Sequence, residues 1–157
     1  MIYPEVVDMK NMLAKILRIS DSIAKPKAAY AHCDIPCGVY ETDSMKWDAE
    51  TVFALTDRML KLEKPADDKA KLQYKNTIAR MIEIKEKHAQ RCKEQILILW
   101  TDYFRPEHFQ THPELTDKIQ KAAKQCSTVK REVSLEQAQK LKDMVAEIAK
   151  IFAETKK

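Results

Sequence analysis

Glycine is almost absent from this chain, which contains a single one, Gly38, among 157 residues. Phosphate-binding loops and dinucleotide fingerprints need several closely spaced glycines, and short hairpin turns are commonly built on Asn-Gly or Asp-Gly. Long apolar runs are also missing, since none approaches the ~20 residues that a membrane-spanning helix needs. The sequence therefore excludes these nucleotide sites, argues against a hairpin-rich β-fold and indicates no membrane partner.

Charge of one sign is not in large excess either. The chain has 28 basic and 24 acidic residues, a formal charge of +4, and no run of five like charges. A surface of this mixed kind is not typical of proteins that bind nucleic acids. We therefore expect no nucleic-acid partner, whereas a small anionic substrate is compatible with the balance.

Helix-forming residues, chiefly Lys, Glu, Ala, Leu and Gln, dominate the composition. Apolar residues recur at helical spacing in four stretches that follow the first 43 residues: 44–62, 66–103, 111–127 and 134–152. In the first stretch we assign the buried stripe to Trp47, Thr51, Leu55 and Met59. Ser134 and Gln137 form a capping box at the start of the last one. The pattern predicts an all-α fold, an up-down-up-down four-helix bundle over residues 44–157.

Residues 1–31 form a separate segment whose apolar residues, spaced as in a helix, predict an amphipathic helix. Lys15 and Arg18 interrupt the apolar stretch that a secretory signal would need. The segment ends in Ala-Tyr-Ala, a small-x-small sequence typical of cleavage sites, directly before His32. We therefore expect a propeptide that a processing peptidase removes. The expected compartment is the cytoplasm, or an organelle if residues 1–31 also act as a targeting segment.

The four cysteines fall into two groups. Cys92 and Cys126 lie within helical patterns and are expected to be buried as small apolar residues. His88 shares a helix face with Cys92, but two ligands do not complete a metal site. Cys33 and Cys37 instead lie in the irregular segment before residue 44, where a Cys-x-x-x-Cys spacing alone is a weak signal.

With a free amino terminus at His32, this segment becomes a specific candidate for a metal site. The α-amine, the amide nitrogen of Cys33 and the thiolates of Cys33 and Cys37 would then form one compact group of donors. A planar set of nitrogen and sulfur donors suits Ni(II) or Cu(II) rather than tetrahedral Zn(II). The imidazole of His32 can serve as an axial fifth ligand.

Residues 32–40 read His-Cys-Asp-Ile-Pro-Cys-Gly-Val-Tyr. This segment resembles the nickel hook of the nickel-containing superoxide dismutases, where His-Cys-Asp-x-Pro-Cys-Gly-x-Tyr begins the mature chain. Residues 99–109 and 150–157 resemble the same family, so the resemblance spans residues 32–157. It implies a four-helix bundle, a homohexamer, one nickel ion per subunit, and conversion of two superoxide anions to O₂ and H₂O₂ by Ni(II)/Ni(III) cycling.

The resemblance also implies roles for individual residues. The metal ligands would be His32, Cys33 and Cys37; Asp34 and Pro36 would support the hook that these ligands form; and Tyr40 and Tyr103 would line the open axial side of the nickel and admit only small anions.

Two positions depart from the family. Asp48 stands where the family has a Glu, and His88 where it has an Arg, and these two family residues steer the axial imidazole. A gap in the helix relative to the family would move the second position to Arg91 or Lys87. Two alternatives remain open: a non-catalytic nickel- or copper-binding bundle, and a helical interaction module in which Cys33 and Cys37 form a disulfide.

Overall fold

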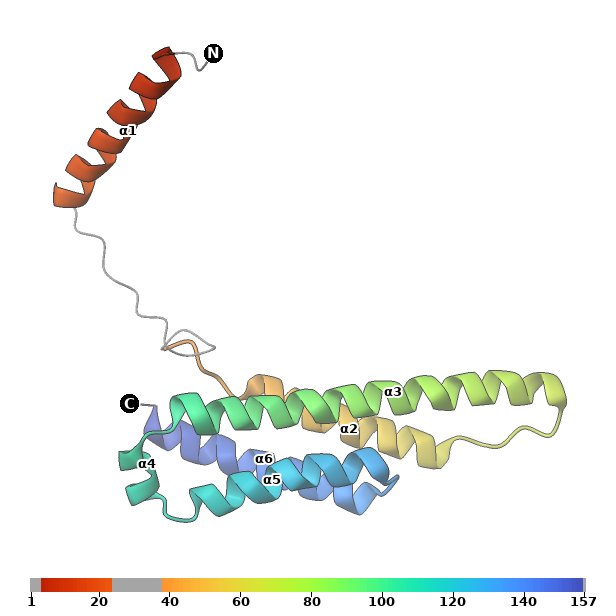
Figure 1. Cartoon of the computed structure of the whole chain (residues 1–157). Helices are drawn as coiled ribbons and strands as arrows, with labels where there is room; N and C mark the ends of the chain where they lie inside the picture. Colours follow the sequence, from red (N-terminus) through yellow and green to blue (C-terminus); the bar gives the residue numbers. More distant parts are fainter. Residues whose placement is uncertain (1–3, 24–37, 157) are drawn as a thin grey trace. The chain divides into compact units, whose positions relative to one another are not determined.

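The computed structural model describes residues 4–23 and 38–156, with side chains at 11–20, 22 and 38–156. The chain divides into two compact units, Met1–His32 and Cys33–Lys157. Within the described ranges every regular element is a helix (Figure 1). None of the helices in these ranges is long and apolar enough to cross a membrane.

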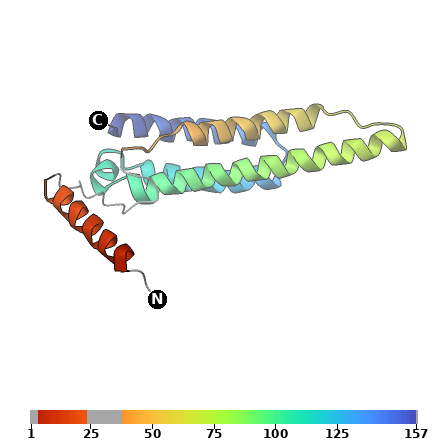
Figure 2. The same ribbon diagram turned by 90° about the horizontal axis from the view of Figure 1, so that it is seen from above.

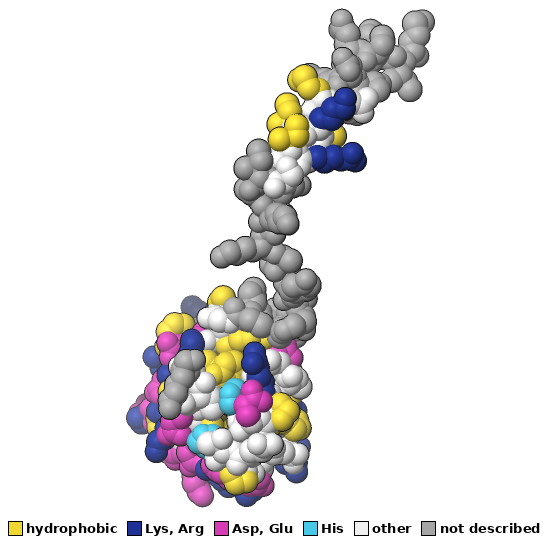
Figure 3. Space-filling model, turned by 90° about the vertical axis from the view of Figure 1, so that its left-hand side faces the viewer, with side chains coloured by type: hydrophobic (Ala, Val, Ile, Leu, Met, Phe, Trp, Pro, Cys, Tyr) yellow, Lys and Arg dark blue, Asp and Glu magenta, His cyan; other side chains and the backbone are white. Residues whose placement is uncertain are grey.

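The first unit contains helix α1, Pro4–Ile23, which confirms the helix predicted from the apolar spacing of this segment. Its described large apolar side chains are exposed, namely Met12, Leu13, Ile16, Leu17 and Ile19. In Figure 3 the hydrophobic and the basic side chains of this helix lie on different sides. The helix is therefore amphipathic, with an apolar face that its own unit does not bury.

The second unit is a bundle of four long helices: α2 (Asp43–Lys61), α3 (Asp68–Ile98), α5 (Leu115–Arg131) and α6 (Leu135–Thr155). Consecutive helices run in opposite directions, and α6 returns to pack against α2 (Figures 1 and 2). This arrangement confirms the predicted up-down-up-down bundle. Both the start of α2 and the end of α6 lie at one end of the bundle, so residues that follow the hook meet the C-terminal residues there.

The predicted buried stripe of α2 was wrong by a fraction of a turn. Trp47 is 71% exposed, whereas the buried face is formed by Met45, Asp48, Ala49, Val52, Leu55 and Thr56. Both sets recur at three- and four-residue intervals, so periodicity alone did not separate them. The observed face carries mostly smaller side chains, which fit in the interior between α2, α3 and α6. The correction brings Asp48 into the core.

The chain between α3 and α5 also differs from the prediction. A π-helical turn, η1 (Leu99–Tyr103), follows α3 and is closed by the Phe104 amide donating to the Leu99 carbonyl at 2.9 Å. A short helix, α4 (Pro106–Thr111), then lies between the second and third predicted stretches. Thr111, where the third stretch was expected to begin, therefore ends α4, and α5 begins four residues later. The cap predicted at Ser134 is confirmed, because its hydroxyl accepts from the Gln137 amide.

The α2–α3 hairpin extends beyond the ends of α5 and α6 at the opposite end of the bundle (Figures 1 and 2). Where α5 ends, the buried Lys85 of α3 reaches across to its last turn. The ammonium donates to the carbonyls of Val129 at 2.5 Å, Lys130 at 3.2 Å and Glu132 at 2.8 Å. One side chain of α3 thus satisfies the carbonyl groups that a helix C-terminus leaves without an intrahelical partner.

Candidate functional site

The predicted metal ligands, His32, Cys33 and Cys37, lie outside the described residues, as do Asp34 and Pro36. Gly38 is the first described residue after this segment, and its φ of 93° is a conformation that favours glycine. Among the described residues, no atom beyond the neighbouring positions lies within 4 Å of the place that a Cβ would take there. The positive φ is therefore the observed reason for a glycine at this position, directly after the predicted hook.

Tyr40 and Tyr103, predicted to border the metal, are brought together by the fold. Their ring centroids are 5.5 Å apart, although 63 positions separate them in the chain. Tyr40 is 4% exposed and precedes α2, while Tyr103 closes the π-helical turn. The ring centroid of Tyr103 also lies 4.5 Å from that of Phe152 and 5.8 Å from that of His108, on which the Tyr103 ring stacks. The turn that sequence patterns did not reveal is thus the element that carries Tyr103.

Figure 3 views the bundle from the end at which α4 and the C-terminus lie. Acidic and basic side chains are interspersed on this face, with histidine side chains among them. An electrostatic potential of one sign is therefore not the main feature of this end of the bundle.

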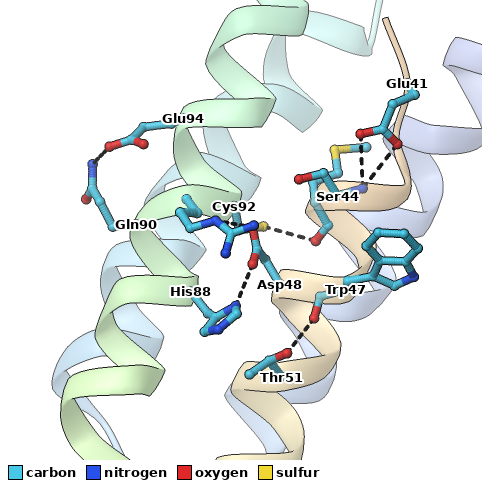
Figure 4. A network of polar contacts seen from close by, with 11 residues as sticks. Glu41, Ser44, Trp47, Asp48, Thr51, His88, Gln90, Cys92 and Glu94 are labelled. Atoms are coloured by element: carbon cyan, nitrogen blue, oxygen red, sulfur yellow. Dashed lines mark hydrogen bonds and ion pairs between the residues drawn. The ribbon is translucent and has the colours of Figure 1, made fainter.

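Asp48 and His88, the two predicted supporting residues, are in direct contact (Figure 4). The Asp48 carboxylate is 1% exposed, and its Oδ1 lies 2.5 Å from His88 Nδ1. Its Oδ2 lies 3.6 Å from Nε of Arg91. A buried carboxylate needs such partners, because its desolvation is costly unless charge and hydrogen bonds compensate for it. The structure therefore gives each oxygen of the Asp48 carboxylate one basic side chain as a partner.

Arg91 was expected at this position only if the helix contained a gap. No gap is needed, because His88 and Arg91 are three residues apart on α3 and so lie on the same helix face. That spacing was the available signal for a joint role. What the sequence could not supply was the rotation of α2 that turns Asp48 toward both.

Cys92 is fully buried behind this network, which confirms the prediction for both helical cysteines, since Cys126 is buried too. Its Sγ donates to the Met45 carbonyl at 3.6 Å. The hydrogen bond to Cys126 and burial raise the pKa of the Cys92 thiol far above its ordinary value. A thiol held protonated in this way is unsuited to binding a metal.

Within residues 38–156 and the described part of α1, no three His, Cys, Asp or Glu side chains are grouped so that they could hold a metal ion. The donor groups predicted from the sequence all belong to the segment before Gly38.

Comparison with known proteins gives a consistent result. The family model described as nickel-containing superoxide dismutase matches residues 27–156. A curated protein of Streptomyces seoulensis, "Superoxide dismutase [Ni]", is 39% identical over 127 residues, which cover 81% of this chain and 89% of that protein. The protein of the same name from Streptomyces coelicolor is 38% identical over 127 residues, with the same coverage of both chains.

Solved structures agree with the sequence relatives. The native structure of nickel superoxide dismutase at 1.30 Å is similar with a TM-score of 0.69 and 36% identity, over 80% of this chain and all of that one. A structure of the nickel-containing enzyme with its ligation in the oxidised state gives a TM-score of 0.68 and 38% identity, over 80% of this chain and 98% of the other.

Proposed function

Because this chain belongs to the nickel-containing superoxide dismutase family, we propose that His32, Cys33 and Cys37 form the nickel site that carries its activity. The protein is a nickel-dependent superoxide dismutase, an oxidoreductase that converts two superoxide anions and two protons into O₂ and H₂O₂, with one nickel ion per subunit. The observation that carries this conclusion is the family match over residues 27–156, which includes every proposed ligand. A non-catalytic metal-binding bundle is not favoured by these relatives.

The donor chemistry of the segment fits the metal. With His32 as the first residue, its amine, the Cys33 amide and two thiolates are nitrogen and sulfur donors of the kind that planar Ni(II) prefers. Bound nickel supplies one-electron chemistry, because anionic thiolate and amide donors make Ni(III) accessible. We propose that the His32 imidazole is the axial ligand and that Asp34 and Pro36 shape the hook.

Tyr40 and Tyr103 are proposed to limit access to the open axial side. Tyr40 is three positions after Cys37, and a chain spans at most ~3.6 Å per residue, so covalent connection keeps their Cα atoms within about 11 Å. Two aromatic rings in contact present an apolar, sterically closed border. Such a border favours a small diatomic anion over larger reductants that would also reach the metal.

Asp48, His88 and Arg91 are proposed to orient the axial imidazole. The support is a buried carboxylate held between an imidazole and a guanidinium, an arrangement that fixes a hydrogen-bond acceptor in one place. Residues 1–31 are proposed to be a propeptide that a peptidase removes before His32, since an amide nitrogen there is a much poorer donor than a free amine.

The ligand assignment is tested by Cys33→Ser and Cys37→Ser in protein that begins at His32. Each should abolish nickel retention and turnover, because a serine hydroxyl is a poor substitute for a thiolate, whereas His32→Gln should retain nickel and lose most activity. Cys126→Ser is the matched control, since its thiol is buried in the core and should leave nickel content unchanged. Normal dismutation by Cys37→Ser protein would refute the proposed site.

A homohexamer is proposed from the family resemblance. It is supported by exposed large apolar side chains on the α2–α3 hairpin: Leu60, Leu72, Ile82 and Ile84. Native mass spectrometry of the processed protein should give six times the subunit mass. A monomer at all concentrations would contradict the assembly without affecting the ligand assignment.

The cytoplasm is the compartment that we propose, with an organelle as the other outcome. The feature that bears on this is α1, whose apolar face is exposed in its own unit. Imaging a fluorescent protein fused after residue 31 distinguishes the two, because a targeting segment would concentrate the fusion in one organelle.

A further inference from the structure

The C-terminal turn of α6 contacts the chain immediately after the predicted hook. The ammonium of Lys156 donates to the backbone carbonyl of Tyr40 at 2.8 Å, across 116 positions of sequence. The same ammonium lies 5.2 Å from the centroid of the Phe152 ring, and this ring packs against Tyr103. Lys156 therefore contacts the Tyr40 carbonyl and the Phe152 ring at the same time.

Thr155, the neighbouring residue, binds Tyr103. Its Oγ1 lies 3.1 Å from the Tyr103 hydroxyl and donates to the Phe152 carbonyl at 2.9 Å. A threonine hydroxyl has one proton. Since that proton goes to Phe152, the Tyr103 phenol is the donor in the first bond, and its O–H points at Thr155.

We propose that this turn, Phe152 to Lys156, is a positioning element of the nickel site: Lys156 fixes the backbone that follows the hook, and Thr155 fixes the direction of the Tyr103 hydroxyl. The inference rests on the proposed ligands at residues 32–37. Cys37, the last proposed ligand, is three positions before Tyr40. A hydrogen bond to the Tyr40 carbonyl therefore restrains the backbone to which Cys37 is attached. The Tyr103 oxygen then offers lone pairs, not a proton, to anything that approaches, so Tyr103 excludes ligands rather than donating to superoxide.

A solvated lysine at a helix C-terminus is the competing explanation. Lysine is favoured there by the helix dipole, and such a role would make no demand on the Tyr40 carbonyl. The two explanations differ in what they predict for nickel, because a dipole effect acts on the stability of α6 and not on the hook.

The test uses nickel-loaded protein that begins at His32. Lys156→Met removes the donor, and Lys150→Met, an identical change at an exposed position of the same helix, is the matched control. We expect nickel release to a chelator about tenfold faster in Lys156→Met, as for loss of one hydrogen bond from a charged group. The EPR spectrum of the oxidised protein should also change, while the thermal midpoints of the two variants stay alike. Lys156→Arg should restore the wild-type release rate, because a guanidinium can donate to the same carbonyl.

Equal release rates and identical EPR spectra for Lys156→Met and Lys150→Met would overturn the positioning role. Cys37→Ser, measured in the same series, separates this failure from failure of the proposed site. If Cys37→Ser retains nickel, the ligand assignment is wrong; if it loses nickel while Lys156→Met behaves as wild type, only the positioning role is wrong. Should Lys156→Met not fold by circular dichroism, Lys156→Gln takes its place with the same expected direction.

Thr155→Val tests the second contact, because it keeps the shape of the side chain and removes the acceptor. It should change kcat/KM for superoxide and leave nickel release unchanged, since the hook anchor at Lys156 is intact. Thr155→Ser should behave as wild type. An unchanged kcat/KM in Thr155→Val would remove Thr155 from the positioning element.

Discussion

Asp48 is a buried acidic residue on a helix whose other acidic residues are more exposed. Its carboxylate is buried between His88 and Arg91. Of these two side chains, the Arg91 guanidinium keeps its charge at every working pH. Arg91 is therefore the permanently charged partner of Asp48.

Arg91→Met should lower activity, because it removes the permanently charged partner of the buried Asp48 carboxylate. We expect kcat/KM to fall by about threefold relative to wild type, as for loss of a weak to moderate ion pair. The measurement needs equal nickel loading and constant ionic strength, because attraction of superoxide is itself sensitive to salt.

Lys87→Met, which removes an exposed lysine of the same helix α3, is the control and should leave kcat/KM unchanged. Equal kcat/KM for wild type and Arg91→Met would mean that this network does not act on the nickel site.

Cys92 and Cys126 should remain unreactive in the folded protein. Burial and their mutual hydrogen bond raise the pKa of the Cys92 thiol, so the reactive thiolate is scarce even at mildly alkaline pH. In a variant with Cys33 and Cys37 replaced by Ser, a thiol reagent should titrate neither remaining cysteine until denaturant is added. Rapid modification of either in the native protein would contradict the buried placement.

At the scale of elements, the helices show which features sequence patterns can reveal. Caps were predictable where a side chain sits at a fixed offset, as at Ser134, because the bond is local. The π-helical turn at 99–103 and the buried face of α2 were not, since both depend on packing between helices. Residues at the site divide in the same way. The family resemblance indicated Asp48 and His88 as supporting residues, whereas their contact with each other and the contact of Lys156 with Tyr40 depend on the fold.

Lys85 joins two elements, and its removal should destabilise the bundle. Lys85→Met leaves three carbonyls at the end of α5 without this donor, which should lower the free energy of unfolding by about 2 kcal/mol. Burial lowers the pKa of Lys85, so the unfolded chain binds this proton more tightly than the folded one does. The contribution of Lys85 to stability therefore rises with pH in the alkaline range below its ordinary pKa.

Denaturant unfolding of Lys85→Met and Lys87→Met at neutral and alkaline pH checks both statements. The control should unfold as wild type, because Lys87 is exposed. Wild-type stability for Lys85→Met would show that the three carbonyls are satisfied without it.

At the scale of the whole molecule, the bundle and the segment before Gly38 have separate tasks. The bundle could be predicted from periodicity, and the metal chemistry from nine residues that precede it. Residues 38–156 contain the tyrosine pair and the Asp48 network, and the segment before Gly38 contains the proposed ligands. These ligands depend on one peptide bond, the one before His32, whose cleavage would turn an amide nitrogen into a free amine.

That cleavage gives the most direct test of the account. Full-length protein and protein that begins at His32 are each incubated with nickel, and bound nickel and superoxide dismutation are measured on the same samples. The account predicts about one nickel per subunit and full activity only in the protein that begins at His32. Equal nickel content and equal activity in the uncleaved chain would contradict the proposed site.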